Sequence, residues 1–198
     1  MMRVVLVDAG GANIGSVRYA LQRLGVDAPL SGDGDAIRRA DRVILPGVGA
    51  AAAAMERLHD LDLVSTLQTL DRPLLGICLG MQLLYESSEE GEVKCLGRLH
   101  GRVRSLPARC GVRIPHMGWN RLHIERPSAL LAGIADGDAA YFVHGYAAAV
   151  DAVTIASCEH GAAFAAAVQD GVIAGAQFHP ERSGRVGLRL LANFLGLE

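Results

Sequence analysis

Short apolar runs alternate with helix-length segments along the first half of the chain. Three of these runs have the length of buried strands. They are residues 4–7, 42–45 and 74–77. Between them, residues 14–24 repeat apolar side chains at helical spacing, and an alanine-rich helix is expected over 50–70 with a break near His59-Asp60. A further helix is expected over residues 79–87.

The second half of the chain is richer in β-type runs, and a helix over 185–195 closes it. The runs cover residues 98–106, 141–144, 154–158, 162–168 and 172–178. Strand–helix alternation in the first half predicts parallel strands with helices on the faces of the sheet. We therefore expect an α/β fold with an open, mostly parallel central sheet flanked by helices, and extra antiparallel strands in the second half. The length of 198 residues predicts a single domain over 1–198.

The overall composition narrows the classes of function. Apolar types make up 51% of the residues and charged types 20%, which excludes a disordered chain. The net charge of −2 gives no bulk attraction to nucleic acid or to an anionic membrane, so neither is an expected partner. No apolar run approaches the roughly 20 residues of a spanning helix, and the first residues turn acidic too early for a signal peptide. We expect a cytoplasmic protein.

Sequence signals for metal or nucleotide cofactors are weak. The four cysteines form no CxxC pair, so no metal site is expected, and those other than Cys78 are expected to be small buried residues. Gly10, Ala12 and Gly15 imitate a dinucleotide-binding loop, but the middle glycine that lets a pyrophosphate approach is missing. A plain strand-to-helix turn is favoured there, and no cofactor is expected.

Cys78 stands where a predicted strand meets a predicted helix. Gly76 and Gly80 complete the pattern Gly-x-Cys-x-Gly, the nucleophile elbow with sulfur in place of oxygen. Such a turn holds the nucleophile in a strained backbone conformation. The N–H groups at the start of the helix favour the thiolate, which is the reactive form of cysteine. We therefore predict that Cys78 is a catalytic nucleophile, against the alternative of a buried cysteine in an ordinary turn.

A base and an orienting group for this nucleophile follow another predicted strand. Pro180 biases His179 toward an extended conformation, and residues two apart in an extended segment point to one side. Glu181 can therefore lie behind His179 and fix its tautomer, as the third member of a catalytic triad. Both motifs lie at the carboxyl end of a predicted strand, and open α/β sheets bind their ligands at these strand ends. His144, also at a strand end, is a weaker candidate for lining the site.

Backbone N–H groups near the sulfur are expected to stabilise an oxyanion. The elbow itself positions the N–H group of Leu79. Pro46-Gly47-Val48-Gly49 follows the neighbouring strand, and its glycines allow a close and adaptable backbone, so the N–H group of Val48 is the second candidate. The alternative for this loop is a simple turn that leads into a helix.

These motifs resemble those of the class I glutamine amidotransferases. The resemblance rests on Gly76-Ile77-Cys78-Leu79-Gly80-Met81-Gln82 and His179-Pro180-Glu181, and it extends over nearly the whole chain. It implies a flavodoxin-like α/β fold and hydrolysis of the side-chain amide of L-glutamine, with the ammonia passed to a synthase partner. Cys78 would attack the carboxamide, His179 would transfer protons and Glu181 would orient His179.

Four segments resemble, more narrowly, the glutaminase subunits of imidazole glycerol phosphate synthases in histidine biosynthesis. They are Leu45-Pro46-Gly47-Val48-Gly49, Pro115-His116-Met117-Gly118-Trp119-Asn120, Tyr141-Phe142-Val143-His144 and Gln177-Phe178-His179-Pro180-Glu181. This likeness implies a heterodimer with a (β/α)₈ barrel cyclase, which forms imidazole glycerol phosphate and an aminoimidazole carboxamide ribonucleotide. Trp119 and Tyr141 match positions at the interface with the cyclase, although from sequence alone a core position is the simpler interpretation of Trp119.

The resemblance also implies a set of glutamine-binding residues. They are Gly49, Gln82, Glu90, Gly145 and Tyr146. Gly145 stands where a serine or threonine is usual, which removes about one hydrogen bond to glutamine. The first loop, Asp8-Ala9-Gly10-Gly11-Ala12-Asn13, and Ala50 also depart from the usual pattern, but the three predicted catalytic residues do not.

Other functions stay open on the sequence. One alternative is the glutaminase subunit of another amidotransferase, such as anthranilate synthase, and another is a free-standing cysteine hydrolase. A non-catalytic protein that kept the fold is disfavoured by the intact Cys78, His179 and Glu181.

Overall fold

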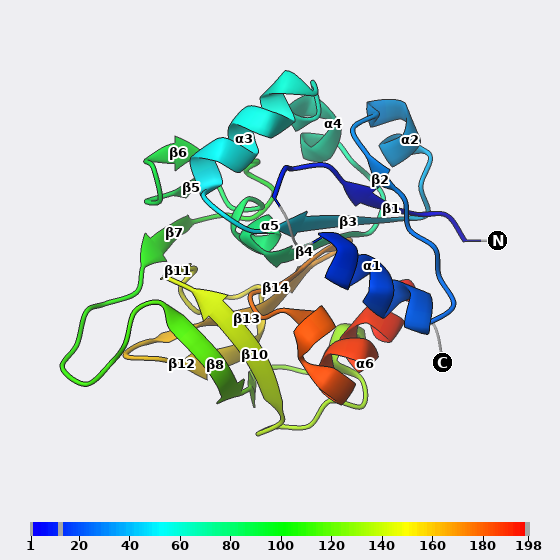
Figure 1. Cartoon of the computed structure of the whole chain (residues 1–198). Helices are drawn as coiled ribbons and strands as arrows, with labels where there is room; N and C mark the ends of the chain where they lie inside the picture. Colours follow the sequence, from blue (N-terminus) through cyan, green and yellow to red (C-terminus); the bar gives the residue numbers. More distant parts are fainter. Residues whose placement is uncertain (1, 12–13, 197–198) are drawn as a thin grey trace.

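An eight-stranded sheet forms the centre of the part of the chain that the computed structural model describes, residues 2–11 and 14–196 (Figure 1). From one edge to the other, the strands are β2 (Leu30–Ser31), β1 (Val4–Val7), β3 (Arg42–Gly47), β4 (Leu74–Cys78), β14 (Ile173–Ala176), β13 (Ala163–Asp170), β12 (Thr154–Glu159) and β9 (His123–Ile124). The pairs from β2 to β14 are parallel, and those from β14 to β9 are antiparallel. The predicted fold class is confirmed.

Helices cover both faces of the parallel half of this sheet. Figure 1 shows α2 (Gly34–Arg38), α3 (Ala51–Asp60) and α4 (Val64–Gln68) above the sheet, and α1 (Ile14–Arg23) with α6 (Gly184–Leu195) below it. Strand β1 alternates between the two layers. Val4 and Leu6 belong to the apolar cluster with α1 and α6, and Val5 and Val7 to the cluster with α3 and α4. Burial on both faces explains why the parallel strands are continuous apolar runs.

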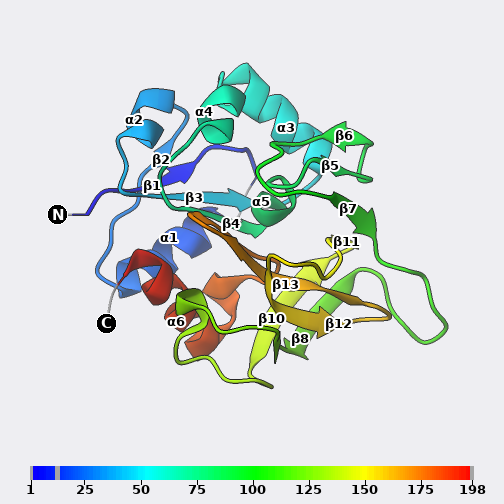
Figure 2. The same cartoon turned by 180° about the vertical axis from the view of Figure 1, so that it is seen from behind.

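Two smaller sheets extend the second half of the described chain. One pairs β10 (Ala139–His144) with β8 (His116–Arg121), and the other joins β11 (Tyr146–Ala147), β7 (Arg102–Ser105), β5 (Ser87–Ser88) and β6 (Val93–Lys94). Figure 2 shows β8 and β10 across the face of β12 and β13. Phe142 of β10 packs against Phe164 of β13, with ring centroids 5.6 Å apart. Of these smaller strands, the sequence pattern predicts only β7 and β10.

Two predicted helices are shorter than expected. The helix expected over 79–87 ends at Gln82, as α5 (Leu79–Gln82). The carbonyl groups of Leu83, Leu84 and Tyr85 accept hydrogen bonds from N–H groups of residues 96–99. They therefore do not accept the hydrogen bonds that a further helical turn would need. The helix expected over 50–70 is divided between α3 and α4, close to the predicted break, where Asp62 has a left-handed φ of 55°.

The cysteines outside the elbow divide into buried and exposed ones. Cys95 and Cys158 are buried, as expected, and burial raises the pKa of the Cys95 thiol to about 11. Cys110 is exposed, so the expectation of burial is wrong for this residue. It lies in a turn between β7 and β8, closed by a hydrogen bond from the Val112 N–H group to the Arg109 carbonyl, and this turn faces solvent.

Residues 2–11 and 14–196 contain neither a membrane-spanning helix nor a cluster of metal-binding side chains. None of the helices there has the length and apolar character that a membrane crossing needs. The same part of the chain holds no group of three or more His, Cys, Asp or Glu side chains arranged to bind a metal ion.

Candidate active site

Cys78 forms a sharp turn between β4 and α5. Its backbone has φ 52° and ψ −111°, a left-handed conformation that residues with side chains rarely adopt. The flanking glycines make room for this turn. A Cβ atom on Gly76 would lie 2.6 Å from the backbone of Met81, and one on Gly80 would overlap the carbonyl oxygen of Leu45. The backbone therefore has the elbow geometry that the Gly-x-Cys-x-Gly pattern predicts.

The order of strands brings the distant motifs to one edge of the sheet. Strand β4 lies between β3 and β14, with Cys78 beside Gly47 and Ile77 beside Ala176. All three strands are parallel, so their carboxyl ends meet. His179 follows β14 by three residues and therefore reaches the side of the elbow.

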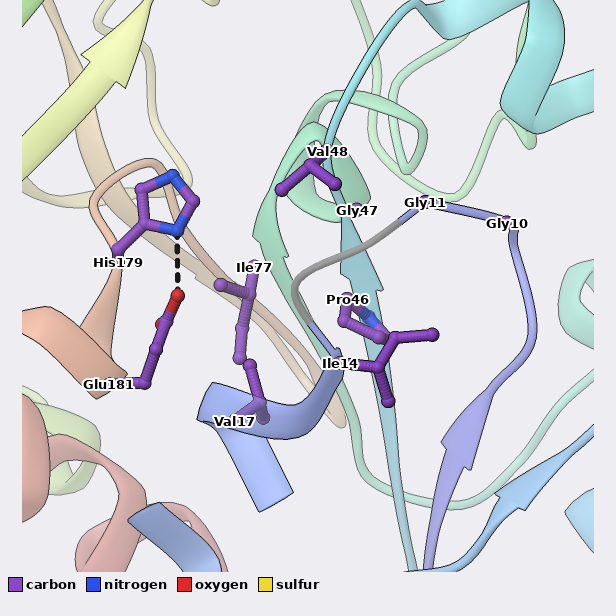
Figure 3. Close-up of a pocket in the computed structure, with 10 residues that line it drawn as sticks. All are labelled: Gly10, Gly11, Ile14, Val17, Pro46, Gly47, Val48, Ile77, His179 and Glu181. Carbon is purple, nitrogen blue, oxygen red and sulfur yellow. Dashed lines mark hydrogen bonds and ion pairs between the residues drawn. The ribbon is translucent and has the colours of Figure 1, made fainter. Parts of the chain in front are cut away.

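His179 and Glu181 form a buried pair at this edge. Nδ1 of His179 lies 2.8 Å from Oε1 of Glu181, and the two side chains are 7% and 1% exposed. His179 is extended, as predicted, but Glu181 lies in the 3₁₀ turn η2 (Pro180–Arg182), so the turn and not an extended segment carries the carboxylate behind the ring. Both residues line a small cavity of about 10 Å³. Figure 3 shows the pair on one side of this cavity, with Gly47 and Val48 on the other.

The surroundings of His179 favour its charged form. Burial by itself lowers the pKa of the imidazole, but hydrogen bonds and charge interactions with Cys78 and Glu181 outweigh burial and raise the pKa to about 10. A sulfur on one side of the ring and a carboxylate on the other thus stabilise the imidazolium. In this form the ring can give a proton to a leaving group.

A cavity of about 170 Å³ opens beside the Cys78 sulfur. All five residues that the resemblance assigns to glutamine binding line it, namely Gly49, Gln82, Glu90, Gly145 and Tyr146. The predicted oxyanion donors Leu79 and Val48 lie on its wall, together with His144 and His179. Residues far apart in the sequence therefore surround one opening, while their individual roles stay predictions.

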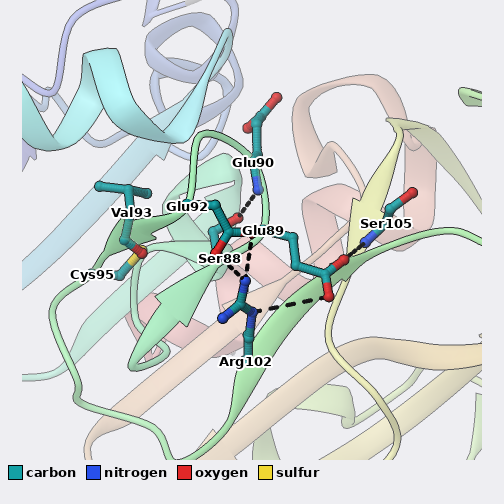
Figure 4. Close-up of polar contacts among 8 residues, drawn as sticks. All are labelled: Ser88, Glu89, Glu90, Glu92, Val93, Cys95, Arg102 and Ser105. Atoms are coloured by element: carbon teal, nitrogen blue, oxygen red, sulfur yellow. Dashed lines mark hydrogen bonds and ion pairs between the residues drawn. The ribbon is translucent and has the colours of Figure 1, made fainter.

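Figure 4 shows how the segment that carries Glu90 is held. Arg102 of β7 pairs with Glu92 at 2.6 Å, and the N–H group of Ser105 donates to Glu89 at 3.0 Å. The Glu90 side chain points away from Arg102, and its carboxylate accepts a hydrogen bond of 2.9 Å from the N–H group of Ala51, the first residue of α3. A negative charge is favourable at this helix end. Among the described residues on the cavity wall, Glu90 is the one acidic side chain.

A series of hydrogen bonds runs from the cavity wall to β8. Nδ1 of His144 lies 2.9 Å from the carbonyl oxygen of Tyr146, which can only accept, so Nδ1 carries the proton and Nε2 accepts from His116 at 3.1 Å. Asn120 donates to the other ring nitrogen of His116 at 3.2 Å. Burial lowers the pKa of His144 to about 3 and that of His116 to about 4, which keeps both rings neutral. The sequence predicts His144 as a lining residue but gives no signal for His116.

Gln177 is a site residue that the sequence pattern alone does not identify. Its side chain is buried, and its Nε2 atom lies 3.7 Å from Sγ of Cys78. The usable signal is its place two residues before His179 in an extended segment, because such residues point to the same side.

The backbone around His179 is tied to β10. The His179 N–H group donates to the carbonyl oxygen of Tyr141 at 2.9 Å. The Ser183 hydroxyl donates to the His179 carbonyl at 2.7 Å and accepts from the Tyr141 N–H group at 2.9 Å. The Arg182 guanidinium lies 4.5 Å from the centre of the Tyr141 ring. Tyr141 therefore contacts the candidate catalytic segment through its backbone and its ring.

Trp119 and Tyr141 form an aromatic pair at the surface. Their rings meet edge to face with centroids 5.9 Å apart. Trp119 is 59% exposed and Met117, on the same strand, is 65% exposed. A core position for Trp119 is therefore wrong, because on β8 every second side chain faces away from the sheet beneath. The interface role of the pair stays a prediction.

The first loop is described only in part. Asp8 pairs with Arg57 at 2.6 Å, and this hydrogen bond lowers the pKa of the Asp8 carboxyl group. Ala9, two residues after β1, is buried. Ala12 and Asn13 lie outside the described residues.

Comparison with known proteins gives the family. Residues 5–196 match the family described as glutamine amidotransferase class-I. The chain belongs to this family. Subunit HisH of imidazole glycerol phosphate synthase from Xanthomonas axonopodis pv. citri is 62% identical over 195 residues, which cover 98% of each chain. The subunit of the same name from Xylella fastidiosa (strain Temecula1) is 57% identical over 198 residues, covering 100% of this chain and 99% of that one. The resemblance noted in the sequence is confirmed.

Solved structures agree on the fold. A crystal structure of a glutamine amidotransferase has a TM-score of 0.75 at 19% identity, over 98% of this chain and 97% of that one. The structure of PurLQS from Thermotoga maritima gives a TM-score of 0.72 at 21% identity, over 98% of both chains. At such low identity these likenesses show the arrangement of the elements and nothing about the substrate.

The pair of His179 and Glu181 gives a prediction on charge. Replacing Glu181 with glutamine removes the negative charge that favours the imidazolium, so the pKa of His179 is expected to fall from about 10 toward its ordinary value of 6.5. Titration of the imidazole C–H resonances by NMR measures this pKa. Glu56→Gln, on the exposed face of α3, is the matched control and should leave it unchanged. An unchanged His179 pKa in Glu181→Gln would show that the carboxylate does not hold the ring charge.

Proposed function

We propose that this chain is the glutaminase subunit of an imidazole glycerol phosphate synthase, which hydrolyses the side-chain amide of L-glutamine and passes the ammonia to a cyclase subunit. The observation that carries the proposal is the shared cavity, where Cys78 at the elbow lies with His179, the partner of Glu181. The relatives named HisH, at 57% and 62% identity, support this synthase over other amidotransferases. We further propose that residues 1–198 act as one glutamine amidotransferase domain, in line with the family match. The cytoplasmic location stays a prediction.

Hydrolysis starts at the sulfur of Cys78. The thiolate attacks the side-chain carbonyl carbon of glutamine, and the N–H groups of Leu79 and Val48 donate to the oxyanion that forms. The imidazolium of His179 gives its proton to the amide nitrogen, so ammonia leaves and a thioester remains on Cys78. His179 then takes a proton from the water molecule that attacks the thioester, and glutamate is released. Glu181 holds the required tautomer of His179 through both halves.

The rest of the cavity wall recognises glutamine. The Glu90 carboxylate suits the α-ammonium group of the substrate, because a charge-assisted hydrogen bond is stronger than a neutral one. Gly49, Gly145 and Tyr146 offer backbone groups, and Gln82 offers its amide oxygen, because its NH₂ group donates to the Tyr146 carbonyl and to Gln177. Since Gly145 carries no hydroxyl group, recognition at this position relies on the backbone alone.

The ammonia acceptor in this proposal is a (β/α)₈ barrel cyclase that forms a heterodimer with the chain. It uses the ammonia to form imidazole glycerol phosphate and an aminoimidazole carboxamide ribonucleotide. The exposed Trp119 and its neighbour Tyr141 are large, rigid anchors of the kind that dominate binding energy at interfaces. Tyr141 also holds the backbone of His179, so the surface offered to the partner adjoins the catalytic segment.

The proposed nucleophile is tested by Cys78→Ala. We expect this variant to lose glutamine hydrolysis, because only binding and oxyanion stabilisation remain without a nucleophile. Synthesis from added ammonia by the complex with the cyclase should continue. Glutamate release and product formation are measured in parallel, with Cys95→Ala as a control for loss of a buried cysteine outside the cavity. Glutamine hydrolysis by a pure Cys78→Ala sample would refute the assignment.

The proposed partner is tested by comparing glutamate release in three states: the chain alone, with the cyclase, and with the cyclase and its nucleotide substrate. We expect the last to be fastest. One well-placed oxyanion donor is worth roughly 10² to 10³ in rate, and the glycines beside Val48 let the loop present it only in the loaded complex.

Two surface variants show whether this stimulation runs through the proposed interface. Trp119→Ala should weaken binding of the cyclase about tenfold or more, while Tyr19→Ala, which removes an exposed ring from α1, should not. Equal glutamate release in all three states would favour the free-standing hydrolase. Stimulation by the partner of another pathway, and not by the cyclase, would favour another amidotransferase.

A further inference from the structure

The side-chain amide of Gln177 is buried between the candidate nucleophile Cys78 and Gln82 of the cavity wall. The residue is 0% exposed and lies between the end of β14 and His179. Its Nε2 atom lies 3.7 Å from Sγ of Cys78, and its Oε1 atom lies 3.0 Å from Nε2 of Gln82. No step of the proposed hydrolysis uses this side chain, although it contacts the reacting sulfur.

The orientation of the Gln177 amide follows from its neighbours. The carbonyl oxygen of Tyr146 can only accept, so the Gln82 atom 2.8 Å from it belongs to the NH₂ group. The same NH₂ group lies 3.0 Å from Gln177, which must therefore turn its oxygen toward Gln82. The NH₂ group of Gln177 is left facing the Cys78 sulfur as a donor. His144 donates to the same Tyr146 carbonyl, so the group that accepts from Gln82 is itself held in position.

We propose that Gln177 stabilises the Cys78 thiolate as a fixed, neutral donor, and that Gln82 and the Tyr146 carbonyl group hold this donor in position. The inference rests on the proposed function, since it takes Cys78 as the nucleophile. A hydrogen bond to a charged group contributes more than one between neutral groups. Because an amide does not titrate, Gln177 donates to the sulfur whether His179 is charged or neutral.

The other groups around the sulfur act differently. The Val143 carbonyl oxygen, 3.7 Å from Sγ, can only accept and therefore favours the protonated thiol. The other titratable residues that line the same cavity are His179, with Glu181 behind it, His144, Glu90 and Tyr146. All of them remain when Gln177 is replaced. A change in the protonation of the sulfur in a Gln177 variant therefore reports the lost donor.

The test is the pH dependence of alkylation of Cys78 in the full chain. Iodoacetamide is the probe, and mass spectrometry of the Cys78 peptide separates this site from the exposed Cys110. In Gln177→Met, which keeps the size of the side chain but has no donor, the midpoint of the rate profile should rise by about one to two pH units. The kcat for glutamine with the cyclase present should fall about tenfold or more, while KM changes little.

Two further variants make the result decisive. Gln177→Asn keeps a buried amide but is one methylene shorter, so it also loses the contact and carries the test if Gln177→Met does not fold. Gln68→Met loses an amide hydrogen bond to the Leu96 carbonyl, outside the cavity, and should leave the midpoint unchanged. An unchanged midpoint in a folded Gln177 variant overturns the inference, even if the wild-type chain hydrolyses glutamine. A raised midpoint without glutamine hydrolysis by the wild-type chain overturns the proposed function instead.

Discussion

The strained turn at Cys78 is the constraint on which the rest of the site depends. A residue with a side chain at φ 52° costs about 1–3 kcal/mol, and such a conformation persists only where its surroundings hold it. Here β4 is paired on both edges, and α5 sits so close to β3 that a Cβ atom on Gly47 would lie 2.7 Å from the backbone nitrogen of Gly80. The turn cannot relax without opening the centre of the sheet, so the sulfur stays at the carboxyl edge.

Two sets of polar contacts surround the Cys78 sulfur that this turn holds at the edge of the sheet. Beside the sulfur, Glu181 holds His179 and the carbonyl of Tyr141 holds its backbone. In the cavity wall, neutral His144 and Gln82 both donate to the Tyr146 carbonyl. The side chains of His179, His144 and Gln82 are buried, and an unpaired polar group is costly in such surroundings. The nucleophile, the histidine and this part of the cavity wall are therefore in place before any substrate binds, and the Val48 N–H group is the part that we propose the loaded complex supplies.

The parallel strands, the elbow and the buried pair could be predicted from the sequence because each has a local signal. Apolar runs mark the strands, and Gly-x-Cys-x-Gly marks the turn. The length of α5 could not be predicted, since the carbonyls after Gln82 bond a segment that is close only in the fold. Strand β8 could not be predicted either, because its alternate residues, such as Trp119 and Met117, are apolar but exposed. The role that we propose for Gln177 depends on Gln82 and Tyr146, which are distant from it in sequence.

The most direct measurement of the central claim is covalent labelling with a glutamine analogue that carries an electrophilic carbon at the side-chain carbonyl position. The chain holds four free thiols, of which Cys110 is exposed and Cys78 lies in the cavity. Peptide mapping therefore distinguishes labelling that needs the cavity to bind the analogue from labelling of a thiol that is merely exposed. If the elbow, the buried pair and the cavity act together, the analogue labels Cys78 alone, and L-glutamine slows the labelling. Labelling of Cys110 in preference to Cys78, or labelling of Cys78 that L-glutamine does not slow, would contradict a glutamine-specific nucleophile at this turn.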